Sequence, residues 1–447
     1  MRIEKSFLYL GIVLMPFIGT VDVAKKIFFP LGSGLFLFLL LGSFFWIIRR
    51  PHIILPSRRI LLFIALFAGL YFISGTINIS FMFQSTWQGV RGVDRFLLSS
   101  GLWSVEFVLL LYIYNIYVLK KDVREQVPLF LLVSFVLSAF CGCLELASTF
   151  GNNAAGELLA GIDSLYRGDL LRQPFRVQSF ASEPSQYSVY LVVVFPLLLF
   201  KLIKSRRFFV YSLLLALFFV LLFATYSRTG YFIVLIELVC FCFVFRNQIR
   251  WRRFCFFFLS FAVFVAMFTS VIGYTVLEGR QVLQIFDTLL SADEALSNMS
   301  NISRFGATLA ALGIFEDNIF FGVGYDQFAF YAANYYPSWS YISPEILDWS
   351  TNYSGRSVWP PAFNYYVRLL AEIGIFGALA WIGLLCSIWY DGWKVVGDSD
   401  ECDYVKIYLV MFLGQAATLF NTSDIGITSI FIVAILLAEI KRIKQAN

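Results

Sequence analysis

Arg228 and Arg304 are the two residues whose type and position most clearly suggest chemistry. Arg228, in ATYSRTGYFIV, lies at the junction of two closely spaced apolar runs, where a cation needs a partner or a polar cavity. Arg304 is expected in the first turn of a helix capped by Asn301 or Ser303, where the helix dipole disfavours a cation. A phosphate at that helix end would satisfy both the guanidinium and the free backbone amides. The two arginines therefore predict an anion-binding site.

Other arginines lie in polar segments on the same side of the apolar runs. Arginine offers a planar fork that suits phosphate oxygens better than the lysine ammonium does. Arg91, Arg172 and Arg176 are therefore candidate substrate-binding residues. For any one of these side chains the alternative is an ion pair with a surface carboxylate, and for Arg228 it is snorkelling toward lipid headgroups.

Glu183 is the carboxylate that the sequence places at the mouth of an apolar helix. Ser182 can cap that helix and Pro184 can take its first position. The helix dipole stabilises a carboxylate there without any functional role, which is the simpler interpretation. The functional interpretation is a general base held at the membrane surface.

A metal centre is not expected from the residue inventory. The single histidine, His52, lies in a basic loop, and the two Cys-x-Cys pairs lie in apolar runs without histidine partners. The Asp-x-Asp motif at Asp398 and Asp400 lies in a loop too short for a nucleotide-binding α/β domain. The sequence therefore predicts no metal and no cofactor.

Membrane helices are the elements that must position these residues. With 59% hydrophobic residues, 14% charged residues and a mean hydropathy of +0.77, a chain of 447 residues cannot bury its apolar surface in one soluble globule. Runs of about 17 to 25 residues, long enough to cross a bilayer, number roughly twelve. They lie near 6–21, 28–48, 60–79, 99–119, 128–149, 185–203, 208–226, 229–245, 254–274, 370–390, 405–421 and 424–440. The prediction is an all-α polytopic membrane protein.

Lysine and arginine fall unequally on the two sides of these runs, which sets the orientation. One side carries mixed lysines and arginines, such as Arg49, Arg50, Lys120 and Lys121, and is assigned to the cytoplasm together with both termini. The opposite segments are longer, yet their cations are nearly all arginine. The net charge of +5 is therefore an orientation signal, and no nucleic-acid partner is expected.

One long polar excursion, residues 276–361, interrupts the apolar sequence. It separates nine predicted spans in residues 1–275 from three spans in residues 362–447. A shorter polar segment near 150–184 lies within the first group. Its sequence predicts an amphipathic helix over 279–295, and then an aromatic stretch that begins with a tight turn at Gly322 and Gly324. Because long loops of membrane proteins usually carry function, we expect the active surface here.

Three blocks, TYSRTG, RFGATLAALGIFEDNIFFGVGYDQF and FNYYVRLLAEIGIFGAL, resemble the O-antigen ligase and polymerase superfamily of bacterial envelope glycosyltransferases. FASEPSQY, in the earlier polar segment, fits the polymerase (Wzy) branch, and the resemblance covers roughly residues 170–390. It implies a metal-independent glycosyltransferase of the GT-C type, with a large helical periplasmic loop, in the bacterial inner membrane. Such an enzyme acts at the periplasmic face on glycans carried by undecaprenyl diphosphate.

The resemblance also implies roles for individual residues. Arg228 and Arg304 would contact the diphosphate that departs when a sugar hydroxyl of one lipid-linked repeat attacks the anomeric carbon of another glycan. Apart from the resemblance, the attacking hydroxyl needs an acceptor for its proton, and we assign this role to Glu183, with Asp326 and Glu372 as rivals. The remaining substrate contacts are expected at Arg176, Tyr325, Asn364 and Tyr365.

One position separates the two branches of this superfamily. Ligases have His-Asn where the last block begins, whereas Phe363 precedes Asn364 here. The polymerase branch is therefore favoured, with a chain-length regulator protein as an expected partner. The alternatives are a ligase or protein O-oligosaccharyltransferase that uses the same donor, and a lipid-linked oligosaccharide flippase, in which internal repeats and short loops are expected.

Overall fold

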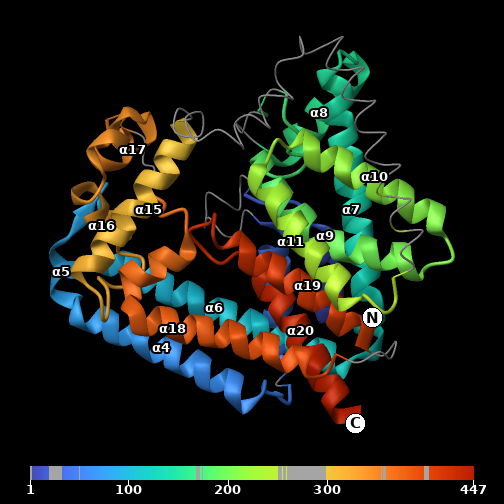
Figure 1. Ribbon diagram of the computed structural model, residues 1–447, viewed down its shortest axis with the longest axis horizontal. Coiled ribbons are helices and arrows are strands. Elements are labelled where there is room, and N and C mark those ends of the chain that lie inside the picture. Colours follow the sequence, from blue (N-terminus) through green and yellow to red (C-terminus); the bar gives the residue numbers. More distant parts are fainter. Residues whose placement is uncertain are drawn as a thin grey trace.

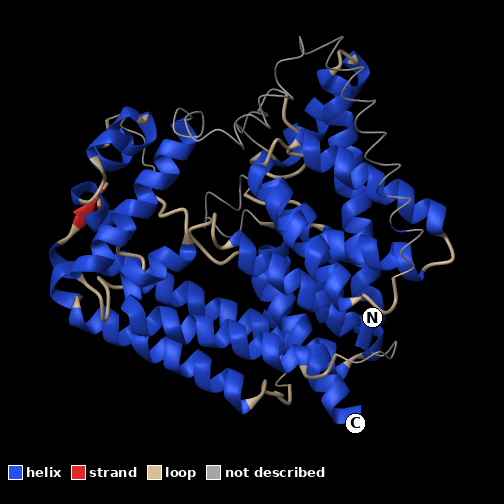
Figure 2. Cartoon of the chain, in the orientation of Figure 1, coloured by secondary structure: helices blue, strands red, loops and turns tan. Residues whose placement is uncertain are grey.

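The fold is that of a computed structural model of the 447-residue chain. It describes residues 3–19, 33–49, 51–167, 172–173, 175–249, 254, 258, 299–353, 355, 359–396 and 402–446. Helices form nearly all of the regular structure, as Figure 2 shows. The predicted amphipathic helix over 279–295 and the Asp-x-Asp motif lie outside the described residues.

The prediction of a polytopic helical membrane protein is confirmed. Five helices in the described part of the chain are long and apolar enough to cross a membrane. They are α4 (Arg58–Ile77), α6 (Gly92–Leu119), α7 (Lys121–Thr149), α9 (Pro184–Lys204) and α18 (Tyr365–Trp393). Six further helices in the described part of the chain coincide with other predicted spans: α1 (Ile3–Val13), α3 (Gly34–Ile48), α10 (Phe208–Ala224), α11 (Arg228–Val244), α19 (Asp403–Thr418) and α20 (Ile427–Ala446). The predicted span 254–274 lies outside the described residues except for Phe254 and Phe258.

Both termini lie at the same end of the helix bundle (Figure 1). Ion pairs hold this end together, and they involve cations of the set that the sequence assigned to one face. They are Lys5 with Asp122, Arg49 with Glu4, Arg124 with Glu439, Lys204 with Asp403 and Lys444 with Asp391. We call this the terminal end, and the opposite end the distal end.

The distal end carries the polar segments (Figure 1). The polar segment near 150–184 contains α8 (Asn153–Tyr166), and the Asn152 side chain caps it by accepting a hydrogen bond from the Ala155 N–H at 3.1 Å. The other elements form a separate group. They are α5 (Ile79–Gln84), the hairpin β1 (Thr86–Trp87) and β2 (Val90–Arg91), α15 (Met299–Asp317), α16 (Phe328–Tyr331), η2 (Ala332–Asn334), η3 (Ser338–Ile342) and α17 (Pro344–Thr351).

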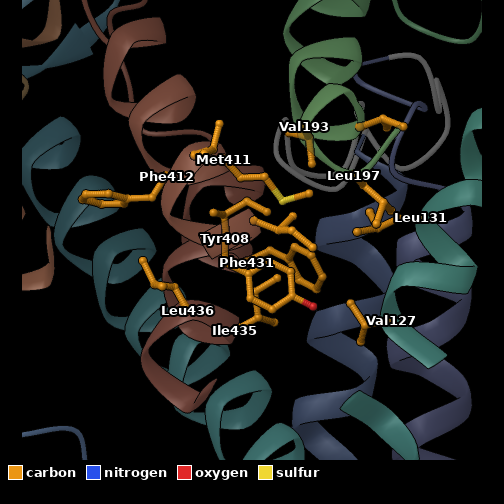
Figure 3. Close-up of a cluster of buried hydrophobic side chains, with 14 of the residues drawn as sticks. Val127, Leu131, Val193, Leu197, Tyr408, Met411, Phe412, Phe431, Ile435 and Leu436 are labelled. Carbon is orange, nitrogen blue, oxygen red and sulfur yellow. The ribbon is translucent and has the colours of Figure 1, made fainter. Parts of the chain in front are cut away.

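Helix α9 lies in the centre of the main apolar cluster, between α7, α19 and α20 (Figure 3). Val193 and Leu197 on α9 are fully or almost fully buried, and they pack with Leu131 of α7 and Met411 of α19. Burying large aliphatic side chains is the main source of packing energy among such helices. Because α9 packs against α11 as well, the distal ends of these two helices are fixed next to each other.

Helix α18 is broken at Gly374, which has φ of +74°. The turn through Gly322 lies against this break, where the Ile375 N–H donates to the Ile319 carbonyl at 2.8 Å. A Cβ atom on Gly374 would lie 2.2 Å from the Phe320 carbonyl oxygen. Only glycine fits both the backbone angle and the space, so the break holds the distal part of α18 at a fixed angle.

Candidate active site

Arg228 is the first residue of α11 and follows a sharp turn. Tyr226 in this turn has φ of +51°, and the Arg176 Nε donates to the Thr225 carbonyl at 3.0 Å. Ser227 caps α11 by accepting a hydrogen bond from the Gly230 N–H at 3.3 Å. The turn thus places Arg228 at the start of a helix, where its side chain is partly exposed.

Arg304 lies within α15 rather than at its start. The described helix already begins at Met299, and the Ser303 Oγ donates to the Met299 carbonyl at 2.9 Å. The prediction that Asn301 or Ser303 caps this helix is therefore wrong, and Arg304 is in the second turn. Ser303 instead contacts the Ser343 hydroxyl at 2.7 Å, which joins α15 to the start of α17.

The loop 419–426 brings the two arginines together. The Arg304 Nη1 donates to the Asn421 Oδ1, and the Asn421 Nδ2 donates to the Thr229 Oγ1 at 2.6 Å. Thr229 is the neighbour of Arg228, so one asparagine bridges α15 and α11. The Arg304 guanidinium also lies over the Phe363 ring, with its central carbon 4.9 Å from the ring centroid. The predicted proximity of Arg228 and Arg304 agrees with this geometry.

Three charged side chains act on the pKa of Arg304. Burial lowers the pKa of the Arg304 guanidinium; the carboxylates of Glu345 and Glu183 oppose this effect, and the charge of Arg228 adds to it. Among the described residues, neither Arg228 nor Arg304 forms an ion pair with a carboxylate. Two partly buried guanidiniums that repel each other without a bound carboxylate form a site suited to an anion.

Glu183 lies at the rim of this site. It occupies the N-cap position of α9, and Pro184 takes the first helical position as predicted. Ser182 does not cap the helix, because its Oγ donates to the Gln186 Oε1 at 2.7 Å. The Glu183 side chain is exposed and accepts a hydrogen bond from the Ser185 Oγ at 3.2 Å. The negative charge of Glu183 raises the pKa of Arg304 and that of Arg176, whereas burial lowers both.

Buried charges fix the loop that precedes Glu183. Arg167, which is 1% exposed, donates to the carbonyls of Ala181 at 3.0 Å and Ser182 at 3.4 Å. On the other side of the loop, the Glu145 Oε2 accepts from the Ser179 N–H at 2.9 Å. The backbone of this loop is thereby held on both sides, which fixes the position of Glu183.

Arg172 belongs to the same structural cluster. Its Nε lies 2.7 Å from the Asp163 Oδ2, and its Nη1 lies 2.9 Å from the Glu145 Oε1. Although burial opposes it, the hydrogen bond to Asp163 and the charge of Glu145 hold the pKa of Arg172 above its usual value. These contacts occupy the guanidinium that we predicted to bind substrate.

Arg91 is exposed and forms a two-pronged contact with Asp94, at 2.8 Å from Nε and 3.1 Å from Nη2. It lies in the hairpin strand that precedes α6. No contact among the described residues links it to Arg228 or Arg304.

A second charged cluster surrounds Asp326, next to the break in α18. Asp326 has φ of +61° and is 4% exposed, and its carboxylate lies 2.6 Å from the Arg95 Nε and 2.7 Å from the Arg368 Nη2. Arg368 also pairs with Glu372 at 3.0 Å, and Glu372 accepts a hydrogen bond from the Phe328 N–H at 3.0 Å. Both rival candidates for the base are therefore engaged in buried contacts. We name this set, together with Asp424, the Asp326 cluster.

The remaining predicted contacts serve as supports in this structure. Asn364 caps α18 by accepting from the backbone N–H of Tyr366 at 3.1 Å. Tyr365 is 1% exposed, and its N–H donates to the Leu419 carbonyl at 2.9 Å. The Tyr325 ring lies 5.2 Å from the Arg368 guanidinium. Asn364 and Tyr365 thereby position Phe363 and the 419–426 loop beside Arg304.

Sequence analysis did not identify Asn421, Thr229 or Arg368 as site residues. Thr229 stands within TYSRTG, and Asn421 lies in the short polar stretch NTSD between two apolar runs, which was the available signal. Among the described residues, no group of three or more His, Cys, Asp or Glu side chains is arranged to hold a metal ion.

The structure is thus a helical membrane protein whose distal end holds two arginines that have no carboxylate partner among the described residues. Residues 212–382 match the family model described as O-antigen ligase (Wzy_C), a range that contains Arg228, Arg304 and Phe363. The resemblance to the superfamily of O-antigen ligases and polymerases is confirmed over this range. Members of this family are membrane glycosyltransferase-like enzymes that act on lipid-linked oligosaccharides. The match does not separate polymerases from ligases, and no curated protein matches the chain significantly.

Proposed function

We propose that this protein is an O-antigen polymerase, a metal-independent glycosyltransferase of the bacterial inner membrane. It transfers a growing glycan from undecaprenyl diphosphate to a sugar of another lipid-linked repeat unit at the periplasmic face. The observation that supports this proposal most strongly is the adjacent pair Arg228 and Arg304, which has no carboxylate partner among the described residues.

The pair suits a departing diphosphate. When the bond between the anomeric carbon and the phosphate oxygen breaks, negative charge grows on the leaving group, and arginine forks neutralise it by charge-assisted hydrogen bonds. The first backbone N–H groups of α11 begin at Arg228, and their positive helix end favours the same anion. Asn421 holds Arg304 in place, so the charge is arranged before the substrate arrives.

Glu183 suits the role of the base. It is an exposed carboxylate whose charge acts on Arg304, as that of Glu345 does, whereas Asp326 and Glu372 are engaged in buried contacts. The attacking sugar hydroxyl gives its proton to Glu183 as the new bond between sugars forms. Water then takes the proton from the exposed carboxyl group, and the diphosphate leaves with the electron pair of the broken bond.

Phe363 supports a polymerase over a ligase. It stands at the position where the ligase branch is expected to have histidine, and its ring packs under the Arg304 guanidinium. A phenyl ring carries no proton to exchange. Its contact with the guanidinium instead orients Arg304 and shields it from water. A transfer that depends on a histidine at this position is not available to this chain.

The test is to incubate the purified protein with one lipid-linked repeat unit in the presence of a chelator. A ladder of products supports a metal-independent polymerase, and Arg304→Lys should suppress the ladder while Arg91→Lys keeps it. Transfer only to added lipid A core would indicate a ligase, and transfer only to a protein would indicate an oligosaccharyltransferase. Transbilayer movement of the repeat unit without any transfer would indicate a flippase.

The proposal also includes the orientation of the chain in the membrane and a chain-length regulator protein as its partner. The terminal end, which carries the lysine-rich ion pairs, lies in the cytoplasm, and the arginine pair lies in the periplasm. A reporter that is active only in the cytoplasm should therefore function when fused after Asn447. A chain-length regulator protein would set the product length, so its removal should broaden the ladder without abolishing it.

A further inference from the structure

An apolar cavity lies next to the loop that joins the two arginines. Its volume is about 110 Å³, and α4, α6, α18, α19 and α20 form its walls. One water needs only roughly 10–15 Å³ on the same measure. Most of the lining is aliphatic or aromatic, and it includes Ile64, Phe67, Leu385, Ile388 and Leu437.

The cavity extends from the 419–426 loop into the bundle. Phe412 on α19 and Leu419, which directly follows this helix, both line the cavity and are about two helical turns apart, or about 10 Å along the helix axis. Ile430 and Leu437 follow the same course along α20. The space is therefore elongated parallel to the helices, as a lipid chain would require.

The 419–426 loop contacts both the cavity and the anion site. Leu419 and Ile425 line the cavity. Between them, Asn421 accepts a hydrogen bond from Arg304 and donates one to Thr229. A ligand in the cavity and an anion at the arginine pair would thus touch opposite sides of one short loop.

Charge distinguishes the two compartments. The arginine pair is positive, whereas Glu106 and Gln415 are polar groups in the cavity wall, and Glu106 has no hydrogen bond or ion pair within the described residues. A diphosphate is attracted to the first compartment, whereas no cation among the described residues lines the second and its mostly apolar wall disfavours an anion. The uncharged chain attached to that diphosphate gains by leaving water for the apolar cavity.

We propose that this cavity binds the first isoprene units of the polyprenyl carrier, and that the 419–426 loop couples their binding to the diphosphate site. The inference rests on the proposed function, because that function supplies a diphosphate attached directly to an isoprenoid chain. Chain binding fixes Leu419 and Ile425, and the loop then holds Asn421 against Arg304. Carriers with a chain therefore bind to a better-ordered anion site than free pyrophosphate does.

The test measures binding of farnesyl diphosphate and of inorganic pyrophosphate to the full-length protein in lipid nanodiscs. Leu385→Trp should fill the cavity and weaken farnesyl diphosphate binding by about tenfold, while pyrophosphate binding stays unchanged. The matched control is Leu213→Trp on α10, where the side chain is 63% exposed and outside the cavity lining, and it should change neither affinity. Equal farnesyl diphosphate binding by both tryptophan variants, or equal loss for both ligands in Leu385→Trp, would overturn the cavity assignment.

Coupling is tested by adding farnesol, which has the chain without the charge. Farnesol should tighten pyrophosphate binding by about fivefold or more in the wild type, and the gain should vanish in Asn421→Ala. A gain that persists in Asn421→Ala would exclude the loop as the link. These readouts need no turnover, so protein that binds as expected but makes no glycan would refute the proposed function and leave the cavity assignment intact.

Discussion

Two groups of arginines at the distal end have the same side chain but opposite surroundings. Arg95 and Arg368 lie within 2.6 to 2.7 Å of the buried Asp326 carboxylate. Arg228 and Arg304 have no carboxylate partner among the described residues, and an asparagine bridges them instead. The first group neutralises charge that the fold has buried, whereas the second leaves positive charge that we propose binds the ligand. On this proposal the partner, and not the residue type, separates structural from functional arginines.

The largest expected effect is on stability in the Asp326 cluster. Arg368→Met would leave the buried Glu372 without its cation and Asp326 with Arg95 alone, which costs about 3–5 kcal/mol. Thermal unfolding of the detergent-solubilised protein should show the loss. The double variant Arg368→Met with Glu372→Met should recover part of it. A fully stable Arg368→Met protein with no activity would instead make Arg368 a functional residue and break the distinction.

The second effect is on turnover at the arginine pair. Arg228→Lys and Arg304→Lys keep a positive charge but lose the fork, so the rate of polymerisation should fall on the order of a hundredfold. The unfolding temperature should stay close to that of the wild type, since no buried carboxylate loses its partner. The rate is measured from the product ladder at saturating repeat unit. An unfolding temperature lowered as much as in Arg368→Met would place the pair in the structural group.

The third effect concerns the carboxylates. Glu183→Gln should slow turnover by about a hundredfold without loss of stability, because the side chain is exposed and its contact is with Ser185. Glu145→Gln is the matched comparison, since the buried Glu145 pairs with Arg172 and accepts hydrogen bonds from backbone N–H groups. Glu145→Gln should lower the unfolding temperature, whereas Glu183→Gln should leave it unchanged. A full-length ladder from Glu183→Gln in cells would show that Glu183 is not the base.

The sequence predicted the helices well because their signals are local. Apolar runs foretold eleven spans that coincide with described helices, and Pro184 marked the start of α9. Pairing between distant side chains had no such signal, since Arg95 and Asp326 are 231 residues apart along the chain. The start of α15 was misplaced because Ser303, which resembles a cap residue, bonds back to Met299 within the helix.

The bridge between the arginines illustrates the same limit. Arg304 and Asn421 are 117 residues apart, and nothing in the local stretch NTSD indicates that Asn421 bonds to Arg304. Arg228 and Arg304 could be singled out from the sequence because a charge at the junction of apolar runs, or one in the expected first turn of a helix, is unfavourable without an anion. Which of the distal arginines would find carboxylates depended on how α6, α15, α18 and the 419–426 loop pack.

A smaller effect is expected where Phe363 supports Arg304. The guanidinium lies 4.9 Å from the ring centroid, and such a contact contributes about 0.5–1 kcal/mol when partly exposed. Phe363→Leu should therefore raise the KM for the repeat unit by about two- to fivefold, and Phe363→Tyr should leave it unchanged. An equal loss in both variants would mean that the shape of this position matters rather than its aromatic face.

The smallest effect is expected at Arg91, which tests whether positive charge anywhere on the distal end is enough. Its guanidinium is exposed and already pairs with Asp94 at 2.8 Å. An exposed ion pair of this kind contributes little, so Arg91→Ala should change the rate of polymerisation by no more than about twofold. The comparison is made at low and high salt, because screening would reduce any long-range attraction of the diphosphate. A loss as large as that of Arg304→Lys, abolished by salt, would show that the field of the whole distal end attracts the substrate. The distinction between paired and unpaired arginines would then no longer explain which of them act.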